Sequence, residues 1–353
     1  MQDAAQYHAD HDGAMYRHGT SVEHRRITVD MRRLLSFIWP SWRSDVESAV
    51  RWLLKTKNRR KILNGLYNRC SQGQKSWVYA RFAKIFRAAE SSIEPGRWTV
   101  EFCGRDVNVP LRQGSMWLDW DCALSVLGHE SAIKSTYETL IRERGFPKCV
   151  FDVGANYGLH SLLYLVHDVD VVSFEPNCAC HEYLKQLEAL NQVQYSLEAV
   201  ALGSGDLAAE LWYPDADTWL GTIQPSRVRE LSVEHRLERV TVPCTTLDRF
   251  VSVSNRVPDL IKLDTEGSEL AILTGARQTL KSARPMVIFE CWKNETRDAL
   301  WRLFEGSGYA IATLPLRSLA GATLIDATTF SQCSDSNFAA LPGELLGNVA
   351  SRS

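Results

Sequence analysis

The first residues in this 353-residue chain that are suited to chemistry form the segment DVGANYG, residues 152–158, which follows an apolar run. Gly154 and Gly158 allow the backbone to pass close to a ligand, and the N–H groups that open the next helix can bind a carboxylate or phosphate. Glu175, followed by Pro176, ends the next apolar run. In a doubly wound sheet, a carboxylate there can accept hydrogen bonds from two ribose hydroxyls. The combination predicts a site for an adenosine-bearing ligand.

The glycine spacing has two other interpretations. Dinucleotide-binding segments follow the pattern GxGxxG, whereas these glycines follow GxxxG and no third glycine packs the helix on its strand. This spacing argues against an NAD(P) site. The alternative that the two glycines only shape a tight loop stays open.

A second acidic group lies in the segment IKLDTEGSE, residues 261–269. Its carboxylates repel one another unless they are paired, so a purely structural role would be costly. Glu269 is equally well explained by its place at a helix N-terminus, but Asp264 is not. Glu290 ends a later apolar run in the same manner. Because open α/β sheets bind ligands at the carboxyl ends of their strands, we expect Asp264, Glu266 and Glu290 to lie near Asp152 and Glu175.

These residues need a scaffold of alternating strands and helices, which the pattern from residue 148 onward predicts. The expected strands are 149–153, 169–174, 196–202, 259–263, 285–289, 309–314 and 337–341. The expected helices are 159–167, 179–190, 268–281 and 295–304. Such alternation implies parallel βαβ units in a doubly wound, mostly parallel α/β sheet.

The chain before residue 148 has another character. Residues 1–28 show no periodicity and are expected to form a disordered tail, and residues 29–147 are expected to form a mainly helical region. A capping box at Ser44 and Glu47 opens its first helix, which is expected to have a basic C-terminal end at residues 55–61. Further helices are expected at 76–89, 120–127 and 133–144, with a short β-hairpin at 98–109.

The composition is that of an ordinary globular protein, with 45% hydrophobic and 23% charged residues. No apolar run reaches the ~18 residues of a membrane span, and the polar N-terminus does not resemble a signal peptide. We therefore expect a cytoplasmic location, where the nine cysteines are reduced. Cys178 and Cys180 are more simply explained by helix packing than by metal or redox chemistry.

Charge is unevenly placed along the chain. Residues 1–90 contain 17 Lys and Arg against 8 Asp and Glu, and the remainder contains 23 against 34. Trp39, Trp42 and Trp52 beside this basic charge suit peripheral contact with a membrane surface or an acidic partner. An ordinary helical cap or a homodimer contact explains them at least as well, and nucleic-acid binding is not expected. Four early histidines have no metal-ligand spacing: His8, His11, His18 and His24.

In this order, the motifs DVGANYG, FEPN, AVALGS, IKLDTEGSEL and VIFE resemble the FkbM family of methyltransferases. The resemblance extends over residues 148–341 and includes a closing strand at 336–342, within a methyltransferase domain expected at 148–345. It implies a seven-strand, Rossmann-like, mostly parallel sheet and S-adenosylmethionine as the cofactor. Better-known members methylate hydroxyl groups of sugars or polyketides.

The resemblance also implies roles for individual residues. Asp152, Gly154, Asn156 and Gly158 would hold the methionine end of the cofactor, Glu175 beside Pro176 the ribose, and Ala201 the adenine region. His160, where the family often places an aromatic residue, is a candidate base, although a packed or capping histidine explains it better. Four aromatic residues are candidate walls of an acceptor pocket or simply core residues: Trp212, Tyr213, Trp219 and Trp292.

Transfer of a methyl group to a hydroxyl requires alignment of the acceptor and removal of its proton. Asp264 and Glu290 are the candidate base and hydrogen-bond partner, with Glu266 beside them. The same two carboxylates could hold Mg²⁺, but no third ligand is evident, so a metal-free reaction is preferred. The acceptor would be a hydroxyl of a small molecule or glycan. The rival hypothesis is a non-catalytic adenosine-ligand-binding protein whose basic N-terminal helices bind a membrane surface or an acidic partner.

Overall fold

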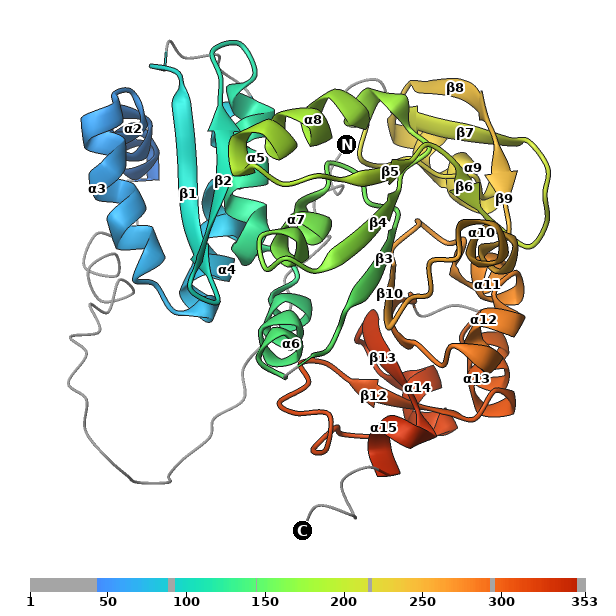
Figure 1. Ribbon diagram of the computed structural model, residues 1–353. Helices are drawn as coiled ribbons and strands as arrows, with labels where there is room; N and C mark the ends of the chain where they lie inside the picture. The colour runs from blue at the N-terminus through green and yellow to red at the C-terminus, as the bar shows by residue number, and fades with distance from the viewer. Residues whose placement is uncertain (1–42, 88–92, 144, 215–217, 293–295, 348–353) are drawn as a thin grey trace, which may run out of the picture. The chain divides into compact units, whose positions relative to one another are not determined.

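The computed structural model describes residues 43–87, 93–143, 145–214, 218–292 and 296–347 (Figure 1). The expected tail at 1–28, the four early histidines, Trp39 and Trp42 lie outside these ranges. All the described residues belong to one compact unit. No helix among the described residues is long and apolar enough to cross a membrane.

A seven-stranded sheet forms the centre of this unit. Its strand order is β12-β13-β11-β10-β3-β4-β5, and only β13 runs antiparallel to its neighbours. The strands are β3 (Cys149–Val153), β4 (Asp170–Phe174), β5 (Ser196–Glu198), β10 (Leu260–Leu263), β11 (Met286–Glu290), β12 (Tyr309–Thr313) and β13 (Asn337–Pro342). This arrangement confirms the expected doubly wound, mostly parallel α/β sheet.

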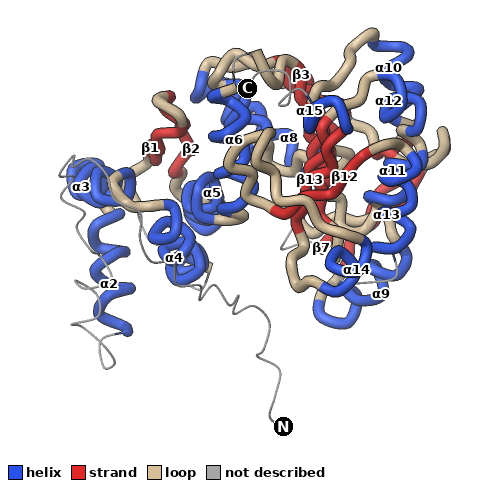
Figure 2. Tube along the Cα trace, turned by 90° about the horizontal axis from the view of Figure 1, so that it is seen from below, coloured by secondary structure: helices blue, strands red, loops and turns tan. Residues whose placement is uncertain are grey.

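Helices cover both faces of the sheet (Figure 2). One face carries α10 (Leu247–Ser254), α11 (Glu269–Thr274), α12 (Arg277–Ser282), α13 (Thr296–Gly306) and α14 (Ala327–Gln332). The other carries α7 (Leu159–Leu165) and α8 (Cys178–Asn191). The alternation within β3 shows why, since Val150 packs in one hydrophobic cluster and Phe151 in the other. Strands buried on both faces need apolar residues at successive positions, as found here.

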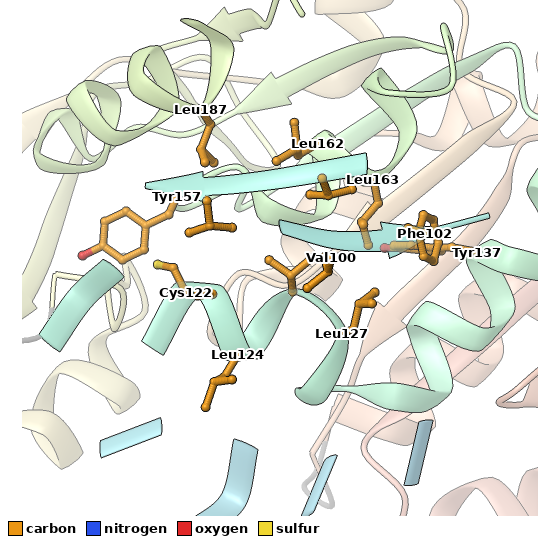
Figure 3. Packing of buried hydrophobic residues seen from close by; sticks show 14 of the residues in the cluster. Val100, Phe102, Cys122, Leu124, Leu127, Tyr137, Tyr157, Leu162, Leu163 and Leu187 are labelled. Atoms are coloured by element: carbon orange, nitrogen blue, oxygen red, sulfur yellow. The ribbon is translucent and has the colours of Figure 1, made fainter. Parts of the chain in front are cut away.

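The N-terminal region packs on the α7–α8 side of the sheet through one continuous hydrophobic cluster. Its elements are α2 (Arg43–Leu54), α3 (Lys57–Asn68), α4 (Gln72–Phe82), a 3₁₀ turn η1 (Ala83–Phe86), β1 (Gly96–Phe102), β2 (Arg105–Leu111), α5 (Met116–Gly128) and α6 (Ser131–Arg142). Figure 3 shows Phe102 from β1 and Tyr137 from α6 beside Leu163 of α7. The two parts of the chain therefore share a core.

An insertion between β5 and β10 lies outside the main sheet. It contains the antiparallel hairpin of β7 (Ala209–Pro214) and β8 (Leu237–Val242), with α9 (Pro225–Glu234) between them. It also contains a small parallel pair, β6 (Ala201–Leu202) with β9 (Cys244–Thr245). The chain ends in a short helix, α15 (Gly343–Gly347).

The structure corrects several sequence-based element predictions. The first helix stops at Leu54 and a second begins at Lys57, so the basic residues 57–61 open α3 rather than close α2. The expected strand 196–202 is split, because only its first three residues join the main sheet. The expected helix 268–281 breaks near Gly275, where a Cβ atom would lie 2.2 Å from the carbonyl oxygen of Gly203.

A substitution at Gly154 tests whether its close contact with Asp264 constrains the loop after β3. Its φ is +77°, and an added Cβ would lie 1.9 Å from the carbonyl oxygen of Asp264. We expect Gly154→Ala to lower the free energy of unfolding by more than ~2 kcal/mol, as backbone strain and overpacking combine. Urea unfolding followed by circular dichroism measures this loss.

Gly114 is the matched control, because its φ is +83° but an added Cβ would meet no heavy atom within 4 Å. Gly114→Ala should therefore show only the strain of a left-handed residue, about 1 kcal/mol. Equal losses for the two variants would mean that the contact with Asp264 does not constrain the loop.

Candidate active site

Four acidic residues meet at the carboxyl edge of the sheet. Asp152 lies in β3, Glu175 follows β4, Asp264 follows β10 and Glu290 ends β11, and these four strands are neighbours in the sheet. The backbone N–H of Asp264 donates to the carbonyl oxygen of Val153 at 3.1 Å, which joins the ends of β10 and β3. The expected convergence of these carboxylates is therefore present.

Glu175 is held by the backbone around it. One carboxylate oxygen accepts the N–H of Asn156 and the other accepts the N–H of Asn177, each at 2.7 Å. Burial raises the pKa of Glu175 to about 7, although these two donors oppose the shift. Each oxygen retains a lone pair, so the carboxylate can accept further hydrogen bonds from a ligand's hydroxyl groups.

The loop between β3 and α7 depends on glycine for its own packing. Gly154 abuts the backbone of Asp264, and a Cβ on Gly158 would lie 2.4 Å from a methyl carbon of Leu184. Asn156 adopts φ of 51°, which directs its N–H to Glu175. Both glycines are required by contacts with protein atoms, whatever ligand the loop binds.

Asp152 is buried, with a relative exposure of 1%. Its Oδ2 accepts the hydroxyl of Ser161 at 2.6 Å, and Ser161 also contacts the hydroxyl of Ser173 at 2.7 Å. Its Oδ1 has no hydrogen-bond partner among the described residues, and the ammonium group of Lys262 lies 3.8 Å away. Asp152 thus supports the loop.

Lys262 links two of the acidic residues. It is 3% exposed, and its Nζ donates to Asp264 Oδ2 at 3.1 Å. Burial opposes its charge, but Asp264 and Asp152 raise the pKa of Lys262 above its ordinary value. Lys262 was not among the residues expected at the site, although a lysine between Ile261 and Leu263 in a buried strand indicates a paired charge.

Glu290 and Glu266 have raised pKa values because both are largely buried near the charge of Asp264. Burial and the charge of Asp264 raise the pKa of Glu290 to about 9 and that of Glu266 to about 7. Glu266 is also paired with Arg227 of α9 at 3.2 Å, and the guanidinium of Arg227 lies 4.4 Å from the ring centre of Trp292. At neutral pH Glu290 therefore carries a proton that it can donate in a hydrogen bond.

Glu269 has a structural role, the alternative considered from the sequence. One of its oxygens accepts hydrogen bonds from the N–H and the hydroxyl of Thr265, both at 2.9 Å. These bonds stabilise the turn that contains Asp264 and Glu266. A residue of the insertion between β5 and β10 stabilises the same turn, because Thr222 donates to the carbonyl oxygen of Glu266 at 3.1 Å.

His160 is packed among residues of α6. Its Nε2 lies 3.0 Å from a carboxylate oxygen of Glu130 and its Nδ1 lies 3.0 Å from the hydroxyl of Tyr137. A carboxylate only accepts, so we assign the ring proton to Nε2 and let Tyr137 donate to Nδ1. The ammonium group of Lys134, which lies 3.2 Å from Nε2, then donates to Glu130 rather than to the ring. Burial and the nearby Lys134 lower the pKa of His160 to about 3. In this arrangement neither ring nitrogen is available to a substrate proton.

Sequence reasoning missed the contribution of the N-terminal region. Glu130 and Lys134 are 3.5 Å apart at the start of α6, and Lys134 Nζ lies 3.2 Å from His160 Nε2. The charge of Glu130 also contributes to the raised pKa of Lys262 and of Glu290. No spacing in the sequence connects residue 130 with residue 160 or 262, so only the fold reveals this cluster.

The remaining candidates lie around this centre. Ala201 is buried in β6, and Pro176 is half-buried beside Glu175. Trp219 and Trp292 are each 40% exposed, while Trp212 lies under the guanidinium of Arg239 at 5.3 Å. Tyr213 is half-buried on the same strand as Trp212. Trp292 follows Glu290 by two residues and lies against the guanidinium of Arg227.

Metal ligation was the other chemistry considered for the acidic residues. Among the residues that the structure describes, no group of three or more His, Cys, Asp or Glu side chains is arranged to hold a metal ion. All nine cysteines are free, with Cys178 exposed and Cys180 buried in α8.

One family model matches part of the chain. Residues 152–311 match the model of the methyltransferase FkbM domain, which confirms the resemblance over those residues. No curated protein matches the chain significantly.

Three solved structures are similar to parts of the chain. A methyltransferase FkbM from Methylobacillus flagellatus KT is 14% identical, with a TM-score of 0.37, and the match covers 63% of this chain and 54% of that protein. A precorrin-6y C5,15-methyltransferase from Geobacter metallireducens GS-15 is 13% identical, with a TM-score of 0.31 and coverage of 61% and 88%. A SAM-dependent methyltransferase from Agrobacterium tumefaciens is 11% identical, with a TM-score of 0.34 and coverage of 69% of each chain. The chain thus spans about half the length of the Methylobacillus protein.

The raised pKa of Glu290 predicts how stability changes with pH. Because the folded state favours the protonated acid, its contribution to stability is fully present below about pH 4.5 and is lost as the pH rises through about 9. Glu290→Gln keeps the neutral form at every pH. Between pH 6 and pH 9, the melting temperature of the variant should therefore fall less than that of the wild type.

Thermal unfolding at several pH values, followed by circular dichroism, measures this difference. Glu305→Gln, on the exposed side of α13, serves as the control and should follow the wild type. Parallel pH curves for Glu290→Gln and the wild type would show that Glu290 ionises normally.

Proposed function

We propose that this chain, whose residues 152–311 form an FkbM methyltransferase domain, is an S-adenosylmethionine-dependent O-methyltransferase. Its acceptor would be a hydroxyl group on a sugar, a glycoconjugate or a polyketide-like small molecule. The observation that carries the proposal is Glu175, whose two oxygens are oriented by backbone N–H groups beside the glycine loop and one strand from Asp152.

The residues present fit an adenosine-bearing cofactor. Glu175 has a free lone pair on each oxygen for the two ribose hydroxyls, and its backbone donors fix the direction of both. The loop of residues 154–158 lies next to it, and Ala201 borders the region where the adenine would lie. When bound, S-adenosylmethionine would supply a methyl group made electrophilic by its cationic sulfur.

Asp264 and Glu290 would then act on the acceptor. The carboxylate of Asp264 would take up the proton that the acceptor hydroxyl loses when it is methylated. Glu290, protonated at neutral pH, donates a hydrogen bond that orients the acceptor. Lys262, 3.1 Å from Asp264, supplies the counter-charge that keeps this carboxylate in place.

Two features of the surrounding residues support a small polar acceptor. Trp292, two residues after Glu290, has a partly exposed ring, and aromatic rings of this kind pack on the faces of sugars. Glu266 and Arg227 form a polar pair beside it that can bind further hydroxyl groups. In the preferred form of the reaction, protein carboxylates rather than a metal ion activate the acceptor.

The cofactor assignment is tested by binding of S-adenosylhomocysteine, measured by isothermal titration calorimetry. Glu175→Ala should weaken binding by about 1.5–3 kcal/mol, the range for hydrogen bonds to charged groups. Glu182→Ala, at an exposed position of α8, should leave the affinity unchanged. Equal affinity in wild type and Glu175→Ala would remove Glu175 from the site, and no binding to the wild type at millimolar concentration would disprove the methyltransferase assignment.

The role of Asp264 is tested by Asp264→Asn, which keeps its size but removes its basicity. On a confirmed acceptor, kcat should fall ~10²–10⁴-fold while the affinity for S-adenosylhomocysteine is kept. A parallel loss of that affinity would assign Asp264 to cofactor binding instead. The metal-free reaction should be indifferent to EDTA, and inhibition that Mg²⁺ reverses would establish metal assistance.

A further inference from the structure

The turn between α5 and α6 places an acidic residue of the N-terminal region against the methyltransferase domain. Glu130 is 12% exposed at its side chain and adopts φ of 47°, a left-handed conformation that is uncommon for glutamate. An acid before a helix usually bonds the N–H groups of that helix. Glu130 makes no such side-chain bond to α6. Its carboxylate turns instead to His160 on α7.

This contact holds His160, which lies in the first turn of α7, just after the glycine loop. His160 lies two residues after Gly158, and both of its ring nitrogens contact α6 or the turn before it. The hydroxyl of Tyr195 also donates to the carbonyl oxygen of Gly158 at 2.9 Å. The end of the loop is therefore held by two separate contacts, and Glu130 supplies one of them.

We propose that Glu130 is a positioning residue of the cofactor site, which holds His160 by a hydrogen bond and thereby fixes the glycine loop. This inference rests on the proposed function, because the loop is taken to bind the amino acid end of S-adenosylmethionine. It makes the N-terminal region part of the site.

A purely structural explanation exists and makes different predictions. Glu130 also neutralises the buried Lys134, so its loss could destabilise the fold without altering the loop. In that case the charge of Glu130 would be the essential property. If positioning is essential, any side chain that accepts the Nε2 proton of His160 should suffice.

Titration calorimetry of S-adenosylhomocysteine with the full chain separates the two explanations. Glu130→Ala should lose about tenfold in affinity, the size of one hydrogen bond to a charged group. Glu130→Gln, whose amide oxygen can still accept from His160, should stay within about twofold of the wild type. Glu138→Ala, on the helix that follows Glu130 and paired with Arg142 at the surface, is the matched control and should bind normally.

Circular dichroism at the temperature of each titration checks folding. Should Glu130→Ala fail to fold, the double variant with Lys134→Met takes its place, because it leaves no buried cation without its partner. Wild-type affinity in the alanine variant, or equal losses for alanine and glutamine, would overturn the positioning role. Absence of binding by the wild type would instead overturn the proposed function, and the inference with it.

Discussion

The pairing of buried Lys262 with Asp152 and Asp264 is the interaction on which the rest of the site depends. A lysine in a strand covered on both faces is tolerated only when opposite charges surround it. Here those charges come from its own strand end and from the neighbouring strand. The ammonium group thereby joins the residue that supports the glycine loop to the residue proposed to receive the acceptor's proton.

The carboxyl groups of the site differ in their protonation at neutral pH. Burial favours the protonated form of an acid, and the charge of a neighbouring carboxylate adds to this effect. For both reasons Glu290 and Glu266, beside Asp264, have raised pKa values. A proton donor and a proton acceptor can therefore coexist at neutral pH within one cluster of identical chemical groups.

The sheet and most of its strand ends were predictable from the sequence because they depend on local patterns. Apolar runs ending in Asp or Glu identify β3, β4, β10 and β11, and Gly154 and Gly158 identify the loop. The hairpin of β7 and β8 was missed because its residues do not alternate cleanly between apolar and polar. The partnership of Glu130 with His160 was missed because it depends on how the N-terminal region docks, which no local spacing encodes. His160 looked like a base by position, but its neighbours occupy both ring nitrogens.

The hydrophobic cluster shared by the two regions has a consequence for biosynthesis. Residues of β1, β2 and α5, such as Trp98, Val107 and Leu124, are buried together with Leu187 of α8 and Leu341 of β13. As the chain leaves the ribosome, the early elements lack the surface that completes their core until almost the whole protein has been made. During that interval they expose apolar side chains, which favours association with chaperones or with other nascent chains. The core of the early elements is thus completed only when the last strand of the sheet has been made.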